Sequence, residues 1–150
     1  MFELHNLLRT IHPNSGHELV ARILLMNSHN FLITQNIDGL HQLSGVDEEQ
    51  IIEIHGSAKK AACLDCLQEN SIQDFHDAIT NNHALPNRSF CNGLVKVATI
   101  SFGQPLIQEH IDKATDLSQQ CDLMIVMGSS LKVMPAGKLP GVTLSQGGKV

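Results

Sequence analysis

Three short apolar runs, each followed at once by a polar loop, constrain this chain more than any other feature. The runs occupy residues 31–34, 51–54 and 123–127, and another begins at 149–150. Parallel strands that are buried on both faces have this continuous apolar character, and the loops at their carboxyl ends lie along one edge of the sheet. The pattern therefore predicts an α/β fold built on a parallel sheet, with polar groups gathered where the strands end.

Helical spacing of apolar residues fills most of the segments between these runs. It covers residues 4–11, 16–28, 72–79, 106–117 and 135–144. Residues 94–102 are rich in β-branched side chains and are expected to be extended. Strands that alternate with helices in this way are typical of a doubly wound α/β sheet.

The composition fits one globular domain and argues against several other classes of protein. The chain has 150 residues, of which 42% are hydrophobic and 17% charged. The formal net charge of -5, the lack of a basic stripe and the lack of Trp and Tyr argue against direct nucleic-acid binding. No apolar run reaches the roughly 18 residues that a membrane span needs, so no membrane association is expected. We expect an intracellular protein, cytoplasmic in preference to nuclear.

Residues 57–94 differ in character from the rest, and we interpret them as a small inserted module that binds a metal. Cys63 and Cys66 have the C-x-x-C spacing that lets two thiolates bind one zinc ion from a tight turn. Cys91 follows downstream, but a second pair would need a cysteine where the sequence has Arg88. Thiols in this pattern fit a metal site better than a disulfide framework. Three of the four zinc ligands are therefore predicted.

The sequence leaves the fourth zinc ligand open. Its candidates are His83, Asp65 and water. An open position is also compatible with catalytic zinc, but no paired general base is evident nearby, so a structural zinc ion is the preferred interpretation. Cys121 opens a predicted strand and is interpreted as a small core residue.

The loop after the first apolar run holds the most informative polar residues. Residues 34–41 have the sequence TQNIDGLH, whose amide and carboxylate side chains can bind a carboxamide or ribose hydroxyls. The same residue types favour capped turns for backbone reasons alone, so both interpretations stay open.

Polar residues also follow the other two runs. An imidazole exchanges protons near neutral pH, so His55 is a candidate general base, although a lone histidine among nine is more often structural. The N–H groups and hydroxyls of Gly128, Ser129 and Ser130 could hold phosphate or ribose oxygens, or could simply form a turn.

Taken in order, these segments resemble the sirtuin family of NAD-dependent protein-lysine deacylases. The matching strings are TQNIDGLH at 34–41, IHGS at 54–57, Cys63-x-x-Cys66, Phe102-Gly103 and Gly128-Ser129-Ser130-Leu131. The first string, followed by His-Gly-Ser at this distance, is highly specific. The resemblance extends from residue 13 to residue 140.

The resemblance implies a partial Rossmann-type parallel sheet with a small zinc-binding insert. Residues 1–150 would form an incomplete catalytic domain, and residues 57–94 the insert within it. The implied reaction moves an acyl group from a lysine side chain to ADP-ribose and releases nicotinamide, so the implied cofactors are NAD and structural zinc. The implied partner is an acyl-lysine protein or peptide, bound as an added strand. No pattern in the sequence indicates an oligomeric state.

The resemblance also implies roles for individual residues. His55 would be the general base that activates the ribose hydroxyls, and Asn36 would be the second catalytic residue. The residues implied to bind NAD are Gln35, Asn36, Ile37, Asp38, His55, Gly128, Ser129 and Ser130. The residues implied to bind the peptide are Ile100, Phe102, Gly103, Leu131 and Val133, and those implied to bind zinc are Cys63, Cys66 and Cys91.

The chain departs from the family pattern at its ends and in two motifs. Residues 1–30 match neither the family's Gly-Ala-Gly loop nor its Arg-bearing cofactor loop, and the family continues past Val150. Arg88 replaces a zinc cysteine, and Gln104 replaces the usual glutamate after Phe-Gly. The chain is therefore expected to be truncated at both ends. Two alternative functions stay open: a non-catalytic form that binds acyl-lysine peptide or a partner, and a protein mono-ADP-ribosyltransferase.

Overall fold

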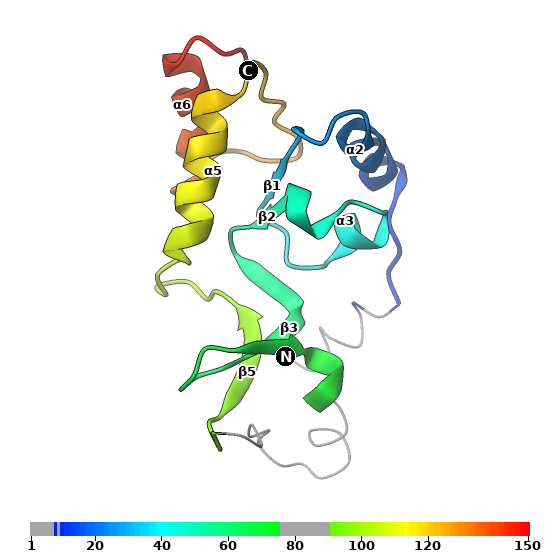
Figure 1. Cartoon of the computed structure of the whole chain (residues 1–150), viewed down its shortest axis with the longest axis vertical. Coiled ribbons are helices and arrows are strands. Elements are labelled where there is room, and N and C mark those ends of the chain that lie inside the picture. Colours follow the sequence, from blue (N-terminus) through cyan, green and yellow to red (C-terminus); the bar gives the residue numbers. More distant parts are fainter. Residues whose placement is uncertain (1–7, 9, 76–90) are drawn as a thin grey trace.

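In the computed structural model, residues 8, 10–75 and 91–150 are described, and they form two small sheets with flanking helices (Figure 1). Strand β1 (Leu32–Thr34) pairs in parallel with β2 (Ile51–Glu53). The second sheet is antiparallel in the order β4-β3-β5, with β3 at Gly56–Cys63, β4 at Glu69–Ser71 and β5 at Val95–Thr99. Only Ile54 and His55 separate β2 from β3, so this histidine stands at the junction of the two sheets.

Helices cover both faces of the parallel sheet. The helices are α2 (Ser15–Leu25), α3 (Leu40–Leu43), α5 (Gln108–Gln120) and α6 (Leu139–Ser145), and the 3-10 turns are η1 (Glu48–Gln50), η2 (Ile72–Phe75) and η3 (Ala136–Lys138). Figure 1 shows α2 and α3 on one side of β1 and β2, and α5 and α6 on the other. Helix α2 begins after Asn14, whose side-chain oxygen accepts the N–H groups of Gly16 and His17.

Each face of the parallel sheet buries its own apolar cluster. The first cluster contains Val20, Ala21, Leu24, Val46 and Ile51, with Leu32 packed against it. The second contains Ile52, Ile54, Ala114, Ala136 and Leu139, with Ile33, Ile111, Leu117 and Met124 packed against it. Successive residues of β1 and β2 therefore point to opposite clusters. This explains why the sequence shows continuous apolar runs, and it confirms the predicted parallel α/β arrangement.

Several predicted elements are found at the expected places. The runs at 31–34 and 51–54 form β1 and β2, the segments 16–28 and 106–117 correspond to α2 and α5, and 94–102 contains β5. The predicted helix at 4–11 lies outside the described residues except at Leu8, Thr10 and Ile11. Of the predicted helix at 72–79, the structure describes residues 72–75, which form the 3-10 turn η2.

The predicted strand at 123–127 is wrong. Only Leu123 forms a strand-like bridge, in parallel with Lys149, and the N–H of Met124 donates to the Lys149 carbonyl at 2.8 Å. A strand needs hydrogen-bonded neighbours along its length. Among the described residues, this segment pairs only at Leu123, which forms a bridge with Lys149. The side chains of Leu123, Ile125 and Met127 are consequently 58%, 58% and 53% exposed.

Two predicted segments differ in detail from the structure. The polar loop at 35–45 contains one helical turn, α3, whose N-cap is Gly39, and the Asp38 carboxylate accepts the N–H of Leu40 at 3.0 Å in the turn that leads into it. The predicted helix at 135–144 begins with the 3-10 turn η3 and continues as α6, which has Pro140 in its first turn. Both differences leave the order of elements unchanged.

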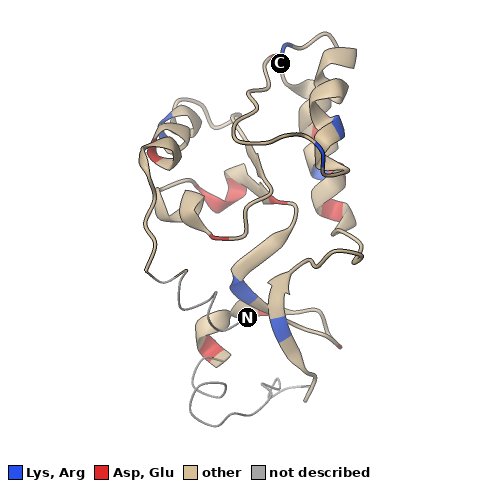
Figure 2. Ribbon diagram, turned by 180° about the vertical axis from the view of Figure 1, so that it is seen from behind, with Lys and Arg blue, Asp and Glu red and all other residues tan. Residues whose placement is uncertain are grey.

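The charged residues that the structure describes are spread over separate elements. Figure 2 shows Lys and Arg on α2, β3, β5 and α5 rather than on one of them. In the described part of the chain, no helix combines the length and the apolar character that crossing a membrane requires.

Candidate functional site

The loop that leaves β1 is held in place at both ends. The buried hydroxyl of Thr34 accepts the N–H of Asn36 at 3.0 Å, and the carbonyl of Ile37 accepts the N–H of Ala58 at 2.8 Å. The Asn36 side chain is exposed between these two anchors. The predicted amide-bearing loop is therefore a fixed feature whose Asn36 side chain is free to meet a ligand.

Asp38 and Gly39 shape the end of this loop. One carboxylate oxygen of Asp38 accepts the N–H of Leu40 in the turn before α3, so the turn interpretation from the sequence is correct for that atom. Gly39 has a φ of +70°, and a Cβ there would lie 2.8 Å from the Lys59 side chain. Lys59 in turn donates through Nζ to the Leu8 carbonyl at 3.0 Å. A glycine is thus required where the loop passes β3.

His55 is half-buried and is oriented by the loop after β1. Its Nδ1 lies 3.1 Å from the carbonyl oxygen of Gln35. A carbonyl oxygen can only accept, so Nδ1 carries the proton and Nε2 of the neutral ring is left as the acceptor. The His55 carbonyl accepts the N–H of Ile100 at 3.0 Å, which ties the same residue to β5. In the neutral ring, Nε2 is therefore the nitrogen left to accept a hydrogen bond.

The Gly-Ser-Ser turn comes to the same place. The Gln35 side-chain amide donates to the Ser129 hydroxyl at 3.2 Å, and that hydroxyl also accepts the N–H of Leu131 at 3.2 Å. Gly128 has a φ of +66° and Ser130 is exposed. The contact of Gln35 with Ser129 thus joins the loop after β1 to the Gly-Ser-Ser turn, and the Gln35 carbonyl also contacts His55.

The two segments expected to bind a peptide are arranged differently from each other. Phe102 is fully exposed after β5, and Gly103 follows it with a φ of +85°. On the other side, Leu131 has a φ of +58° and the Val133 carbonyl accepts the N–H of Gly137 at 2.8 Å. Between the described residues of these two segments, no hydrogen bond is present. Each segment therefore keeps an exposed surface.

Sequence reasoning missed Glu53, a carboxylate within the second apolar run. Partial burial raises its pKa, and this effect is opposed by hydrogen bonds from Gln42 and Ser57 and by the charge of Lys60. The Glu53 carbonyl also lies 3.1 Å from Nδ1 of His110 on α5. A charged residue that interrupts an apolar run was the signal available in the sequence. Glu53 links β2 to α3, β3 and α5, two positions before His55.

His41, the last residue of the TQNIDGLH string, contacts α2. Its ring centroid lies 4.8 Å from that of His17. Burial lowers the pKa of His41, the charge of His17 lowers it further, and Asp38 works in the opposite direction. Burial of His41 against α2 therefore favours its neutral form.

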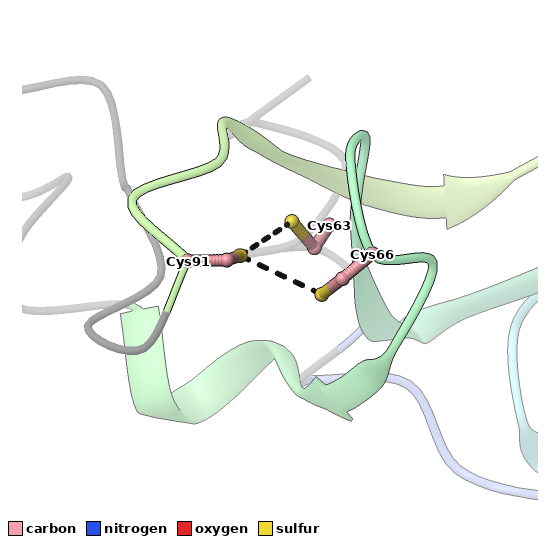
Figure 3. Close-up of side chains that lie close together, drawn as sticks. All are labelled: Cys63, Cys66 and Cys91. Atoms are coloured by element: carbon pink, nitrogen blue, oxygen red, sulfur yellow. Dashed lines mark hydrogen bonds between the residues drawn. The ribbon is translucent and has the colours of Figure 1, made fainter.

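The three predicted zinc ligands converge on one point (Figure 3). The sulfur atoms of Cys63, Cys66 and Cys91 all lie within 4.8 Å of one another. Sγ of Cys91 is 3.5 Å from that of Cys63 and 3.6 Å from that of Cys66. Thiolates bound tetrahedrally to zinc at about 2.3 Å are about 3.8 Å apart, so these sulfur atoms fit one face of such a site.

The backbone around the cysteines also suits a metal. Leu67 and Asn92, the residues that follow Cys66 and Cys91, have φ values of +58° and +54°, so each chain turns back tightly after its cysteine. The Gly93 N–H acts to lower the pKa of the Cys91 thiol, but the neighbouring Cys63 and Cys66 thiols outweigh it and raise that pKa. A cation among the three sulfur atoms would favour their thiolate forms.

A family model agrees with the geometry of this site. The model described as "Sir2 family" matches residues 1–135. The chain belongs to the Sir2 family. This confirms the resemblance to the sirtuins and the predicted class of fold.

Individual members of the Sir2 family resemble the chain over nearly all of its length. "NAD-dependent protein deacetylase 1" of Bradyrhizobium diazoefficiens is 38% identical over 149 residues, which cover 99% of this chain and 58% of the relative. A solved Sir2 structure with an acetylated peptide has a TM-score of 0.82 at 34% identity, and one with a p53 peptide and NAD+ has 0.80 at 35%. Both structures match 95% of this chain and 58% of their own. The chain spans somewhat more than half the length of these Sir2 proteins.

Proposed function

We propose that this sirtuin acts as an NAD-dependent protein-lysine deacylase, which moves an acyl group from lysine to ADP-ribose and releases nicotinamide. The observation that carries the proposal is the position of His55. Its Nδ1 is engaged by the Gln35 carbonyl, and Gln35 also reaches Ser129 across the site. A base, an amide-bearing loop and a hydroxyl-bearing turn therefore meet at the ends of two sheet segments, where α/β proteins bind nucleotides.

Each group in the site has a task in this proposal. NAD, when bound, supplies the ADP-ribose that receives the acyl group. His55 accepts a proton at Nε2 from a ribose hydroxyl, because its Nδ1 already carries one. Asn36 and Asp38 hold the carboxamide and the ribose by hydrogen bonds, with Gln35 and Ile37 beside them. The Gly128–Ser130 turn, which carries the Ser129 hydroxyl, binds ribose or phosphate oxygens.

The acyl-lysine substrate is a peptide that adds as a strand. It would lie between residues 100–103 and 131–134, with contacts from the predicted residues Ile100, Phe102, Gly103, Leu131 and Val133. The exposed Phe102 and the exposed Val133 leave apolar surface available for it. Relatives in this family bind such substrates, since the solved Sir2 structures include acetylated and propionylated peptides.

In this proposal, residues 1–150 belong to one catalytic domain. Residues 57–94 form a zinc module within it. Strands β3, β4 and β5 and the cluster of Cys63, Cys66 and Cys91 support it. The zinc ion would be structural, because the thiolates lie at the far end of β3 from His55. The module would hold β5 in place and thereby fix the peptide segment that follows β5.

The test is nicotinamide release from NAD by the purified protein, with and without an acetyl-lysine peptide. We expect peptide-dependent release that is lost in His55→Ala, because the ribose hydroxyl then has no base. His29→Ala is the matched control, since the exposed His29 contacts its neighbour Asn27 and lies outside the site. Equal release by wild type and His55→Ala would refute the proposed role.

Two outcomes of the same assay would favour the other functions. Peptide binding without any nicotinamide release would favour a non-catalytic, acyl-lysine-binding form. Mass spectrometry that finds ADP-ribose on a protein acceptor, with no loss of the acyl group, would favour mono-ADP-ribosylation.

A further inference from the structure

The two segments proposed to flank the substrate peptide carry positive charge and no negative charge. Residues 91–108 and 123–140 contain no Asp or Glu, although the chain as a whole has a net charge of -5. The lysines of these stretches are Lys96, Lys132 and Lys138. None of them forms an ion pair within the described part of the chain. The peptide segments therefore differ in charge from the rest of the molecule.

Lys96 places its ammonium group at both ends of the segment 100–103. Its Nζ donates to the carbonyl of Thr99 at 2.8 Å and lies 3.5 Å from Oε1 of Gln104. These two acceptors stand immediately before and after the segment proposed to contact the peptide. Both acceptors are uncharged, so they hold the ammonium beside the segment and leave its charge in place.

Gln104 fixes the turn after β5 without adding a charge. Its Oε1 accepts the N–H of Ser101 at 2.9 Å, and its own N–H donates to the Ser101 carbonyl at 3.0 Å. A glutamate could accept the same bonds, but its carboxylate would offset the charge of Lys96 at close range. The amide keeps the geometry of the turn and lets the positive charge act on a ligand that binds next to the fully exposed Phe102.

The second segment presents its lysines to solvent. Lys132 and Lys138 are both exposed, the first within the segment and the second at the end of η3. The turn η3 packs directly on the segment, because a Cβ on Gly137 would overlap the Leu131 carbonyl and the Gly137 N–H donates to the Val133 carbonyl at 2.8 Å. A strand that lies between the two segments would therefore meet positive charge on each side.

We propose that this peptide site selects acyl-lysine substrates whose flanking residues are acidic, and that Lys96 and Lys132 set the preference. The inference rests on the proposed deacylase function and on the place given there to the peptide. The acyl-lysine itself is uncharged, because its nitrogen is part of an amide, so recognition of charge falls to the neighbouring residues of the substrate. An acidic strand is attracted by both segments, whereas a basic strand is repelled by both.

The test measures the binding of fluorescent acetyl-lysine peptides to the purified chain by anisotropy at low ionic strength. The peptides have the same length and differ only in the residues on either side of the acetyl-lysine, which are Glu, Gln or Lys. Exposed charge pairs are weak, so we expect the Kd to rise about two- to five-fold from the Glu to the Gln peptide, and again from the Gln to the Lys peptide. In about 0.5 M salt the three values should converge, because the charges are then screened.

Lys132→Glu tests the charge at the second segment. The Lys132 side chain is exposed and forms no ion pair with the described residues, so its replacement should leave the fold intact. It should lower the ratio of the Kd for the Lys peptide to that for the Glu peptide by at least about two-fold. Lys149→Glu is the matched control, because it makes the same change in net charge beside Leu123, at the start of the segment that leads to the Gly-Ser-Ser turn. It should keep the ratio of the wild type.

Equal affinity for the three peptides, tighter binding of the Lys peptide, or no binding of any of them would overturn the inference. The same change of ratio in both variants would also overturn it, because net charge alone would then be responsible. Nicotinamide release separates these results from the proposed function. Release without a charge preference would reject the inference and leave the deacylase function standing, whereas a charge preference without release would support the inference and count against deacylation by this chain.

Discussion

Gly56 is the residue on which the junction between the two sheets depends. It has a φ of +74°, and a Cβ there would overlap the backbone carbonyl of Ala98 on β5. We expect Gly56→Ala to destabilise the protein by the strain of a left-handed residue, about 1–2 kcal/mol, and by overpacking, about 1–3 kcal/mol more. Urea unfolding of both proteins measures the difference.

Gly45→Ala is the matched control for this prediction. Gly45 also has a positive φ, +95°, but nothing lies within 4 Å of the position of its Cβ. The unfolding free energy of Gly45→Ala should therefore fall by about 1–2 kcal/mol, through backbone strain alone. Equal losses in the two variants would show that the approach of β5 to Gly56 costs nothing.

Glu53 should make the folded protein less stable as the pH rises. Burial raises its pKa in the folded protein above the value of 4.5 for the free side chain, so the folded state binds the proton more tightly. Its contribution to the unfolding free energy is greatest below pH 4.5 and is lost as the pH rises through the raised folded pKa. Glu53→Gln should flatten this decline.

Chemical unfolding at a series of pH values tests this, with Glu49→Gln, at an exposed position of η1, as the control. The control should keep the pH dependence of the wild type. If Glu53→Gln also keeps it, the Glu53 carboxyl is not the group responsible.

Sequence reasoning at this scale found the residues that carry recognisable chemistry and missed those that act through burial. His55, Gln35 and Ser129 were all predicted, because they belong to polar loops after apolar runs, and the structure places them together. Glu53 was missed because its partners Gln42 and Ser57 become neighbours only in the folded chain. The individual roles in binding and catalysis remain predictions.

At the scale of elements, β2 is the strand that holds the two apolar clusters together. Ile51 belongs to the cluster beneath α2, while Ile52 and the fully buried Ile54 belong to the cluster beneath α5 and α6. We expect Ile54→Ala to lower the unfolding free energy by about 2–5 kcal/mol. Leu25→Ala, on the exposed side of α2, should change it by less than about 0.5 kcal/mol. Similar losses in the two variants would contradict this picture of the core.

The elements that the sequence predicted best are those with a strong apolar pattern. Strands β1 and β2 are short but buried on both faces, so their residues are apolar at every step. Strand β3 was missed, because alanines and lysines give residues 56–63 no clear alternation. The segment 123–127 has the composition of a strand but not its hydrogen bonds. A strand forms only where a second strand lies beside it, and the composition of the segment does not show whether one does.

At the scale of the whole molecule, the exposed side chains of the segment 123–127 form an apolar surface that can associate with another chain. Leu123, Ile125 and Met127 alternate along the segment, and all three are more than half exposed. Such a segment pairs readily with another chain. We expect Ile125→Lys to reduce the concentration-dependent self-association of the chain, as measured by light scattering, without lowering its melting temperature.

Leu19→Lys is the control, because Leu19 is similarly exposed but stands on a regular helix whose backbone is already paired. An equal effect of both substitutions would mean that added charge, and not the loss of a pairing surface, reduces association.

The architecture was predictable as a class but not in its arrangement. Alternating strands and helices predicted a parallel α/β sheet, and the fold confirms it. The spacing of the cysteines predicted a metal module, but the antiparallel sheet that carries it depends on pairings such as Ala61 with Val97, which no local pattern reveals. An intracellular, cytoplasmic location remains a prediction from composition.

The contact between Gln35 and Ser129 has a consequence for how the molecule comes into being. The two residues are 94 positions apart, so the loop that must close before they meet is long, and its closure is slow relative to local helix formation. During synthesis, Gln35 and His55 leave the ribosome well before Ser129 does. A newly made chain can therefore pack α2 on β1 and β2 early, while the contact of Gln35 with Ser129 is completed only after the last third of the sequence has folded.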